Sequence, residues 1–218
     1  MEKNQDDVRG IASMSKMISQ YLILEAIKNS EITWETKIPI SERASKLSAN
    51  YSLSNVPLWP NEKYSFQELF EASSIYSANA ATIAMAEYLA GSEAKWVERM
   101  KEKVESWGIQ DATIVNATGL PNKYGTTEKN PDFGDDAENS MSARSVAIVA
   151  RHLVLDFPEI LKISSVATKE FRPGTAGMTK MDNFNYLIPG LLFGYEGVTG
   201  LKTGTSEISG ASITTTAT

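Results

Sequence analysis

Apolar residues are most densely spaced near the N-terminus, where a nearly continuous run extends from Met14 to Ile27. The run places apolar side chains on almost every face of a helix rather than on one stripe, which is typical of a helix surrounded by protein. We therefore predict a central, buried helix over residues 13–28. Residues 1–10 are polar and charged, and we expect them to form a loop or the end of a hairpin.

Amphipathic spacing and capping residues predict most of the remaining helices. Ser-Phe-Gln-Glu at 65–68 fits a capping box, in which a serine and a glutamate three residues later bond each other's backbone groups. The helix that begins there is expected to end near Ser74, and Gly91 is expected to stop the helix that follows it. The predicted helices after the first are 65–74, 79–90, 92–107, 142–155 and a short one that starts at Pro158.

Extended segments are predicted where β-branched residues and glycines replace the helical spacing. Residues 197–205 alternate such residues with glycine, which is typical of a strand that another backbone approaches closely. Residues 29–63 are rich in Ser, Asn and Pro, so we expect brief strands or extended loop there. The predicted strands are 36–40, 168–172, 197–205 and one that begins at Ile213, with a long loop over 116–139 and an apolar loop or short helix over 183–194.

Composition excludes several kinds of function. The chain has 21 basic and 27 acidic residues, and its net charge of −6 argues against a nucleic-acid surface. There is no cysteine, and the single histidine, His152, cannot form a histidine metal cluster, so we expect no metal and no cofactor. His152 lies on an amphipathic helical pattern and is interpreted as a surface or core residue. No apolar run approaches the ~20 residues of a membrane span, and the N-terminus does not resemble a signal peptide.

Ser13 and Lys16 open the apolar run in the pattern Ser-Met-Ser-Lys. Three residues apart on a helix, the two side chains share a face, with about 5–6 Å between their Cβ atoms. A serine hydroxyl is a weak nucleophile until a base removes its proton, and a lysine whose burial disfavours the charged form can be that base. Ser92 and Lys95 repeat the pattern in a charged, solvated helix, where we interpret Ser92 as a capping residue.

Two short motifs further along the chain could complete such a site. Lys-Thr-Gly at 202–204 places an ammonium group beside a hydroxyl, which suits a carboxylate ligand, and its glycine lets the ligand's backbone lie against the strand. Ser-Ala-Asn at 77–79 supplies a hydroxyl that can relay protons and an amide that can hold a peptide carbonyl. The same triplet recurs at 48–50, but in a Ser-rich segment without flanking predicted helices, so we favour 77–79, which joins two helices.

In order and wide spacing, these motifs match the Ser-x-x-Lys, Ser-Asp-Asn and Lys-Thr-Gly combination of penicillin-binding proteins and class A β-lactamases, with Ala78 in place of the aspartate. Beyond them, the sequence resembles the low-molecular-mass penicillin-binding proteins, which are serine-type D-alanyl-D-alanine carboxypeptidases of the peptidase S11 type. The segments that carry the resemblance are 11–17, 116–120, 183–187 and 200–204, which span nearly the whole chain.

The resemblance implies an α+β fold like that of serine β-lactamases and transpeptidases, with an antiparallel sheet flanked by helices and a mostly helical inserted lobe. Residues 1–28 and 165–218 are expected to form the sheet lobe with the nucleophile helix, and 29–164 the helical lobe. Family members have further strands on both sides, whereas 12 residues precede Ser13 and 14 follow Gly204. The sheet is therefore expected to be incomplete at both chain ends with an unpaired edge, because the chain is a fragment or because another chain supplies the missing strands.

The resemblance also implies how individual residues remove the terminal D-alanine from a peptidoglycan stem peptide. Ser13 is expected to form the acyl-enzyme, Lys16 to take its proton, and Ser77 to pass a proton to the leaving D-alanine. Backbone N–H groups of Ser13 and Thr205 are expected to form the oxyanion hole. The expected substrate-binding residues are Asn79, Lys202, Thr203, Gly204 and Thr205.

The partners that the resemblance implies are stem peptides ending in D-Ala-D-Ala and β-lactam antibiotics, with no nucleic acid. The expected place of action is the cell wall or membrane surface of a bacterium, outside the cytoplasm, with membrane contact only through a C-terminal anchor that this sequence lacks. Two alternatives stay open. A serine β-lactamase would need a deacylating base, for which the loop offers Glu128 and Glu138. A truncated, non-catalytic fragment would only bind penicillin or peptidoglycan.

Overall fold

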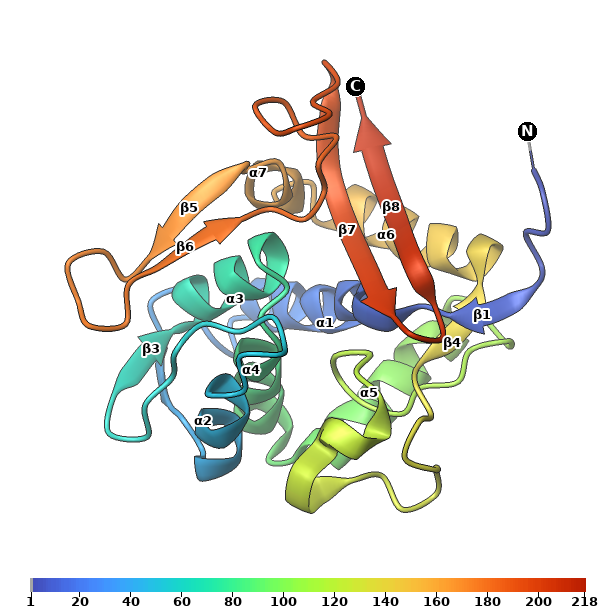
Figure 1. The fold of residues 1–218 in the computed structure, drawn as a ribbon. Helices are drawn as coiled ribbons and strands as arrows, with labels where there is room; N and C mark the ends of the chain where they lie inside the picture. The colour runs from blue at the N-terminus through green and yellow to red at the C-terminus, as the bar shows by residue number, and fades with distance from the viewer. Residues whose placement is uncertain (1) are drawn as a thin grey trace.

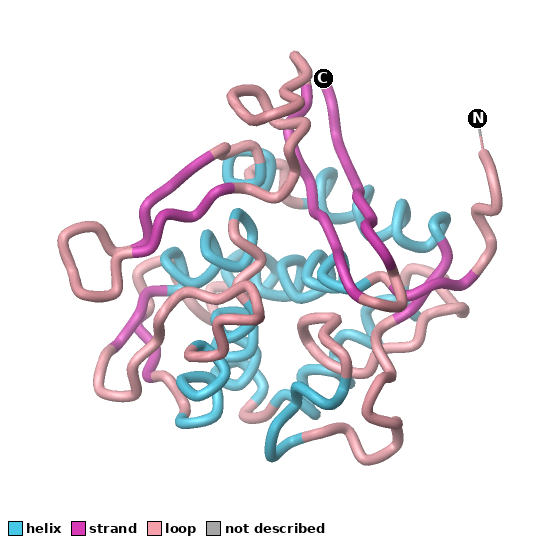
Figure 2. Tube along the Cα trace, in the orientation of Figure 1, coloured by secondary structure: helices cyan, strands magenta, loops and turns pink. Residues whose placement is uncertain are grey.

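The computed structural model describes residues 2–218 and, within this range, every side chain except those of residues 126–128. Helices occupy the middle of the molecule, and strands lie around them in antiparallel pairs (Figure 1, Figure 2). The helical segments are η1 (Ala12–Ser15), α1 (Lys16–Lys28), α2 (Glu42–Ser48), α3 (Phe66–Ile75), α4 (Asn79–Ala90), α5 (Glu93–Ser106), η2 (Asn122–Glu128), α6 (Ala143–Asp156) and α7 (Ile160–Ser164), where η denotes a 3₁₀ helix.

The strands form two-stranded antiparallel sheets. The pairs are β1 (Val8–Gly10) with β4 (Ser140–Ser142), β2 (Lys37–Pro39) with β3 (Lys63–Ser65), β5 (Thr168–Phe171) with β6 (Thr179–Asp182), and β7 (Val198–Ser206) with β8 (Gly210–Ala217). The β7–β8 hairpin has the longest strands and packs against η1, at the head of the central helix (Figure 1). No third strand of the described chain pairs with it.

Helix α1 is the central helix that the apolar run predicted. Every side chain from Lys16 to Leu24 is buried, and α3, α4, α5 and α6 all contact this helix. The predicted start was wrong, because the chain forms the 3₁₀ turn η1 before the α-helix begins at Lys16. Ala12 enters this turn with a left-handed φ of +41°. The nucleophile candidate therefore lies in a tight turn ahead of the α-helix rather than inside it.

Some helices and strands of the structure were not predicted from the sequence. Helix α2 lies where strands or extended loop were expected. The sequence did not predict this helix because, of its seven residues, only Ala44 and Leu47 present apolar side chains to the core. Strand β1 was expected to be a loop or the end of a hairpin, but its partner lies far along the chain, where Val8 pairs with Ser142. Strands β3 and β6 are the partners of the predicted strands β2 and β5.

Large buried side chains hold the helices together around α1. Trp96, from α5, donates a hydrogen bond from Nε1 to Ser19 Oγ of α1 at 3.0 Å, and Phe66 and Phe70 of α3 are fully buried. This packing fixes the start of α1 relative to α3 and α5, and α4, which also contacts α1, begins with Asn79 of the site. Of the described helices, none combines the length and the apolar character needed to cross a membrane.

Candidate active site

Ser13 and Lys16 are brought together by the 3₁₀ turn η1. A 3₁₀ helix has about three residues per turn, so side chains three apart lie directly above one another. Lys16 Nζ accordingly lies 2.7 Å from Ser13 Oγ. Ser13 is half-buried, while Lys16 is completely buried. The turn thus delivers an amine to a partly exposed hydroxyl, which is the pair that the sequence predicted.

Three oxygen atoms surround the Lys16 amine. Besides Ser13 Oγ, it contacts Asn79 Oδ1 at 2.8 Å and the backbone carbonyl of Thr118 at 3.1 Å. No carboxylate lies among these contacts, so nothing in them compensates a positive charge by ion pairing. Burial, and secondly the charge of Lys202, hold the pKa of Lys16 well below its usual range. The neutral amine that a general base requires is therefore favoured.

Ser77 and Asn79 lie at the junction between α3 and α4, as predicted. Ser77 has a left-handed φ of +57°, a conformation that a non-glycine residue adopts only when its surroundings enforce it. Asn79 is buried, with Oδ1 turned to Lys16 and Nδ2 donating to the Ser54 carbonyl at 3.0 Å. The junction thus presents the serine hydroxyl to the pocket and fixes the asparagine against the lysine.

Strand β7 brings Lys202 to the same place. Its Nζ donates to Ser77 Oγ at 3.0 Å and to the Thr203 carbonyl at 3.1 Å, and its side chain is buried. Burial lowers the pKa of Lys202 to about 7. Lys202 and Gly204 are buried and Thr203 is half-buried, because successive side chains of a strand point to opposite faces.

Gly204 allows β7 to approach the turn η1, which carries Ser13. A Cβ atom at this position would lie 2.6 Å from the Ile11 carbonyl oxygen and 3.2 Å from the Ser13 nitrogen. Both distances are shorter than an ordinary contact of about 3.5–4.0 Å, so a side chain would push the strand away from Ser13. Nearer the start of the strand, Asn185 Nδ2 donates to the Gly200 carbonyl at 2.7 Å and anchors β7 to the preceding loop.

A pocket of about 490 Å³ opens beside these groups. Ser13 and Ser77 form one side, and Thr203, Gly204 and Thr205 of β7 form another. An apolar wall comes from the loop before β7 and from β8. Its members are Phe184, Tyr186, Leu187, Phe193, Ala211 and Ile213. Of the eight residues predicted for the site, five line this pocket, and Lys16, Asn79 and Lys202 contact the lining residues Ser13, Ser54 and Ser77, respectively.

The loop after Asn116 contributes a group that motif reasoning did not assign, the Thr118 carbonyl. Asn116 Oδ1 accepts hydrogen bonds from the backbone nitrogens of Thr118 and Gly119 at 3.1 and 2.7 Å, which closes the loop into a tight turn. Gly119 has a φ of +80°, and a Cβ there would lie 1.8 Å from the Ala12 carbonyl oxygen. The Asn-Ala-Thr-Gly spacing was the available signal, because it is typical of a turn that needs glycine.

The repeated motifs lie elsewhere. Ser92 caps α5 by accepting from the Lys95 nitrogen at 3.3 Å, so the capping interpretation is confirmed. Ser48 was expected in a loop without helices, which is wrong: it ends α2 and accepts from the Leu58 nitrogen at 3.1 Å. His152 stacks on Trp107 with ring centroids 4.7 Å apart, in agreement with a packing role.

Of the two glutamates considered as a deacylating base, the structure describes the side chain of Glu138. Glu138 is buried, with Oε1 accepting from Ser206 Oγ at 2.9 Å, and burial raises the pKa of its carboxyl. It is outside the group of residues that line the pocket beside Ser13. The side chain of Glu128 lies outside the described residues. In the described part of the chain, no three His, Cys, Asp or Glu side chains are grouped as a metal site requires.

Comparison with known families gives one match over the full sequence. Residues 1–218 match the model of the peptidase S11 family, described as D-alanyl-D-alanine carboxypeptidase. The D-alanyl-D-alanine carboxypeptidase DacF of Bacillus subtilis is 31% identical over 202 residues, which cover 93% of this chain and 46% of that protein. DacA of Haemophilus influenzae is 30% identical over 217 residues, 99% of this chain and 49% of that protein. The chain thus spans about half the length of these relatives.

Solved structures show the same architecture. The chain is similar to a peptidoglycan synthesis regulatory factor, PBP3, of Streptococcus pneumoniae, with a TM-score of 0.93 and 40% identity over 100% of this chain and 59% of that one. Penicillin-binding protein D2 of Listeria monocytogenes, in an ampicillin-bound form, gives a TM-score of 0.77 and 26% identity over 100% of this chain and 78% of that one. These likenesses confirm the predicted α+β, transpeptidase-like fold.

Proposed function

Because the chain belongs to the D-alanyl-D-alanine carboxypeptidase family, peptidase S11, we propose that it is the catalytic part of a serine D-Ala-D-Ala carboxypeptidase. The reaction removes the terminal D-alanine from peptidoglycan stem peptides through an acyl-enzyme on Ser13. The observation that carries the proposal is the fully buried Lys16 amine, 2.7 Å from Ser13 Oγ with no carboxylate among its hydrogen-bond partners. A lysine in this setting serves as a base rather than as a charge.

Acylation begins when the Lys16 lone pair accepts the proton of Ser13 Oγ. The oxygen attacks the carbonyl carbon of the penultimate D-alanine, and the negative charge moves to the carbonyl oxygen, which the backbone N–H groups of Ser13 and Thr205 bind. Loss of one such donor costs about 3–4 kcal/mol in other serine enzymes. Gly204 has no side chain, which lets β7 approach the Ser13 nitrogen. This close approach supports an oxyanion hole built from Ser13 of η1 and Thr205 of β7.

Ser77 completes the proton transfer. Its Oγ accepts a hydrogen bond from Lys202 at 3.0 Å, which leaves its own proton to donate. When the C–N bond breaks, Ser77 passes this proton to the leaving D-alanine amine and is reprotonated from Lys16. Water then hydrolyses the ester on Ser13. Lys16 takes a proton from the attacking water and passes it to Ser13 Oγ as the ester bond breaks, which restores the free serine and the neutral amine and releases the shortened peptide.

Lys202 and Thr203 hold the terminal carboxylate of the substrate. A half-buried hydroxyl beside a buried ammonium forms charge-assisted hydrogen bonds to such a group. Asn79 has two tasks in this scheme. Its Oδ1 fixes the Lys16 amine, and its Nδ2, already bonded to the Ser54 carbonyl, has a second N–H with which to hold the substrate amide.

β-Lactams acylate the same serine, because a strained lactam with a carboxylate has the shape of the D-Ala-D-Ala end. The Listeria relative bound to ampicillin supports this. The substrate places the enzyme outside the cytoplasm, at the cell wall. The sheet lobe, 1–28 and 165–218, supplies Ser13, Lys16 and Lys202, and the helical lobe, 29–164, supplies Ser77 and Asn79.

A penicillin adduct and a D-alanine assay test the proposal together. Mass spectrometry after penicillin treatment should locate a long-lived adduct on the peptide that contains Ser13, and a D-Ala-D-Ala peptide should release free D-alanine. Rapid turnover of penicillin would instead indicate a β-lactamase. An adduct without D-alanine release would indicate a binding fragment. An adduct on another serine would refute the assignment of the nucleophile.

A further inference from the structure

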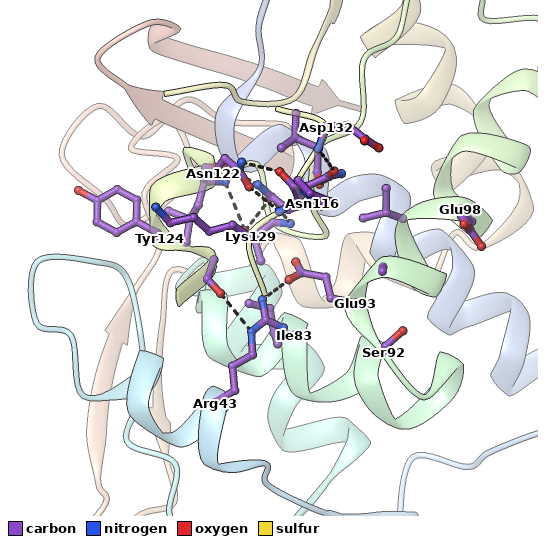
Figure 3. Close-up of a pocket in the computed structure, with 18 of the residues that line it drawn as sticks. Arg43, Ile83, Ser92, Glu93, Glu98, Asn116, Asn122, Tyr124, Lys129 and Asp132 are labelled. Atoms are coloured by element: carbon purple, nitrogen blue, oxygen red, sulfur yellow. Dashed lines mark hydrogen bonds and ion pairs between the residues drawn. The ribbon is translucent and has the colours of Figure 1, made fainter. Parts of the chain in front are cut away.

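A buried ion pair lies on the far side of the loop that contacts Lys16. Arg43 of α2 and Glu93 of α5 meet in a cavity of about 460 Å³ (Figure 3), and each of the two side chains is only 7% exposed. One carboxylate oxygen of Glu93 contacts the Arg43 guanidinium. The other oxygen, Oε1, accepts a hydrogen bond from the Ala117 backbone nitrogen at 2.9 Å. Neither residue belongs to the motifs of the proposed reaction.

The Ala117 nitrogen and the Lys16 contact belong to adjacent parts of one rigid turn. Thr118 follows Ala117, and its carbonyl is the one that accepts from Lys16 Nζ at 3.1 Å. One planar peptide group joins the two residues, and the hydrogen bonds that Asn116 Oδ1 accepts from the Thr118 and Gly119 nitrogens restrain rotation about the neighbouring bonds. A shift of the Ala117 nitrogen, such as would follow the loss of its hydrogen bond to Glu93, therefore moves the Thr118 carbonyl. On the opposite face, the Ala117 carbonyl accepts from Ser19 Oγ at 2.9 Å.

The Thr118 carbonyl decides where the Lys16 lone pair points. A neutral amine has two N–H groups and one lone pair, and Lys16 has three oxygen neighbours. The Thr118 carbonyl and Asn79 Oδ1 can only accept, so they take the two N–H groups. The lone pair is left for Ser13, whose hydroxyl is the one neighbour able to donate. Without the Thr118 carbonyl, an N–H could turn to Ser13 and the amine would no longer be aligned as a base.

We propose that Glu93, held by Arg43, is a positioning residue for the general base: it fixes the turn at Ala117 and thereby the Thr118 carbonyl that orients the Lys16 amine. The inference rests on the proposed function, since it assigns Lys16 the role of base. A carboxylate suits this position because its second oxygen has a buried cation to satisfy it. Glu93 touches neither the pocket beside Ser13 nor a reacting atom, so it acts only through the turn.

Two matched double variants separate the hydrogen bond from the ion pair. Arg43→Met with Glu93→Gln removes both charges of the pair but keeps an acceptor for the Ala117 nitrogen, whereas Arg43→Met with Glu93→Met removes the acceptor as well. Both variants also lose the ion pair of Arg43 with Glu87, at 3.1 Å, so this loss cancels when the two are compared. The penicillin acylation rate and the dissociation constant of the preceding complex are measured for both. We expect the Met/Met variant to acylate about 10–100-fold more slowly at nearly unchanged dissociation constant, because small misplacements of catalytic groups have effects of this size. The Met/Gln variant should recover most of the rate.

Glu25→Ala serves as the control, since it breaks the ion pair with Lys103 between α1 and α5 but leaves the turn untouched. Its acylation rate should equal that of the unaltered chain. If the Met/Met variant does not fold, Ala117 can be replaced by its α-hydroxy analogue, which exchanges the N–H for an ester oxygen and keeps every side chain. The same loss of acylation rate is expected. Equal rates in the two double variants, or an unaltered rate in the ester variant, would overturn the inference.

The amine itself provides a readout that does not depend on penicillin. The ¹³Cε chemical shift of Lys16 should change in the Met/Met variant and return towards the original value in the Met/Gln variant. If the unaltered chain is not acylated but these shifts behave as expected, the positioning role stands and the proposed function fails. If the chain is acylated but the shifts and rates do not follow the acceptor at position 93, the positioning role fails alone.

Discussion

Replacing Gly119 with alanine tests how closely the turn after Asn116 must approach the turn η1, which carries the proposed nucleophile Ser13. The added Cβ would lie 1.8 Å from the Ala12 carbonyl oxygen and 2.6 Å from Ser15 Oγ. Two atoms at van der Waals contact are about 3.5–4.0 Å apart, so in Gly119→Ala the turn after Asn116 and η1 must move apart by roughly 1 Å or more. This movement would draw the Thr118 carbonyl away from Lys16 and shift Ser13 with its turn.

The cost has two parts, and Gly91 allows them to be measured separately. Left-handed backbone costs a non-glycine residue about 1–2 kcal/mol, and relieving an overpacked contact costs about 1–3 kcal/mol more. Gly119 has a φ of +80° and close contacts, so Gly119→Ala should lose stability through both the backbone strain and the overpacking. Gly91 has a φ of +81° with nothing within 4 Å of an added Cβ, so Gly91→Ala should lose stability through the backbone strain alone. Gly119→Ala should therefore unfold at a temperature roughly 2–12 °C below that of Gly91→Ala, since 1 kcal/mol shifts Tm by about 2–4 °C in a domain of this size.

Thermal unfolding and penicillin acylation of the two variants provide the assay. Gly91→Ala should lose stability without losing acylation rate, because Gly91 only ends α4. Gly119→Ala should lose about 100-fold in acylation rate even at temperatures where it is fully folded, as expected for a displacement of about 1 Å at a catalytic group. Equal melting temperatures, or an acylation rate in Gly119→Ala equal to that of Gly91→Ala, would refute the close packing argued here.

Three further predictions follow from the pocket. Ser13→Ala should abolish covalent penicillin labelling, and mass spectrometry that still finds an adduct would place the nucleophile elsewhere. Lys202→Ala should lower kcat/KM for carboxylate-bearing peptides by about 10–150-fold, which corresponds to the loss of one hydrogen bond between charged groups. The kcat/KM for uncharged esters should fall far less. Equal losses of kcat/KM for the two kinds of substrate would show that Lys202 does not bind the carboxylate. For carboxylate substrates, kcat/KM should fall as the pH rises through about 7, because Lys202 loses its proton there. Uncharged esters should show no such decline.

The central helix and part of the predicted site could be predicted from local sequence patterns, because the residues that form them are close together in the sequence. An apolar run long enough for several turns predicts a buried helix wherever it lies, and Ser13 and Lys16 meet through their own spacing. The junction at Ser77 was likewise predictable, since its flanking helices carry their own capping signals. Placing Lys202 beside Ser77 depended on the family resemblance, because 125 positions separate them.

Features set by distant contacts could not be predicted in the same way. The 3₁₀ turn at Ala12–Ser15 forms where β7 and the turn at Gly119 press against it, and neither is near it in sequence. Helix α2 has too few apolar residues to show a helical period. Glu93 illustrates the limit most clearly. Its sequence neighbours identify a helix start, whereas its contact with Ala117 exists only once α5 is packed on the loop.

The two buried lysines depend on each other, and in the proposed reaction this dependence couples substrate binding to catalysis. Burial disfavours the charged form of both amines, and the charge on Lys202 further lowers the pKa of Lys16. When a substrate carboxylate reaches Lys202, it neutralises that charge, so the Lys16 pKa must rise as the lysine is about to accept the Ser13 proton. The acid limb of kcat should therefore lie at higher pH than the acid limb of kcat/KM, since kcat reports the complex and kcat/KM the free enzyme. Lys202→Ala should move the acid limb of kcat/KM in the same direction; acid limbs that coincide in all three profiles would show that the two amines are not coupled.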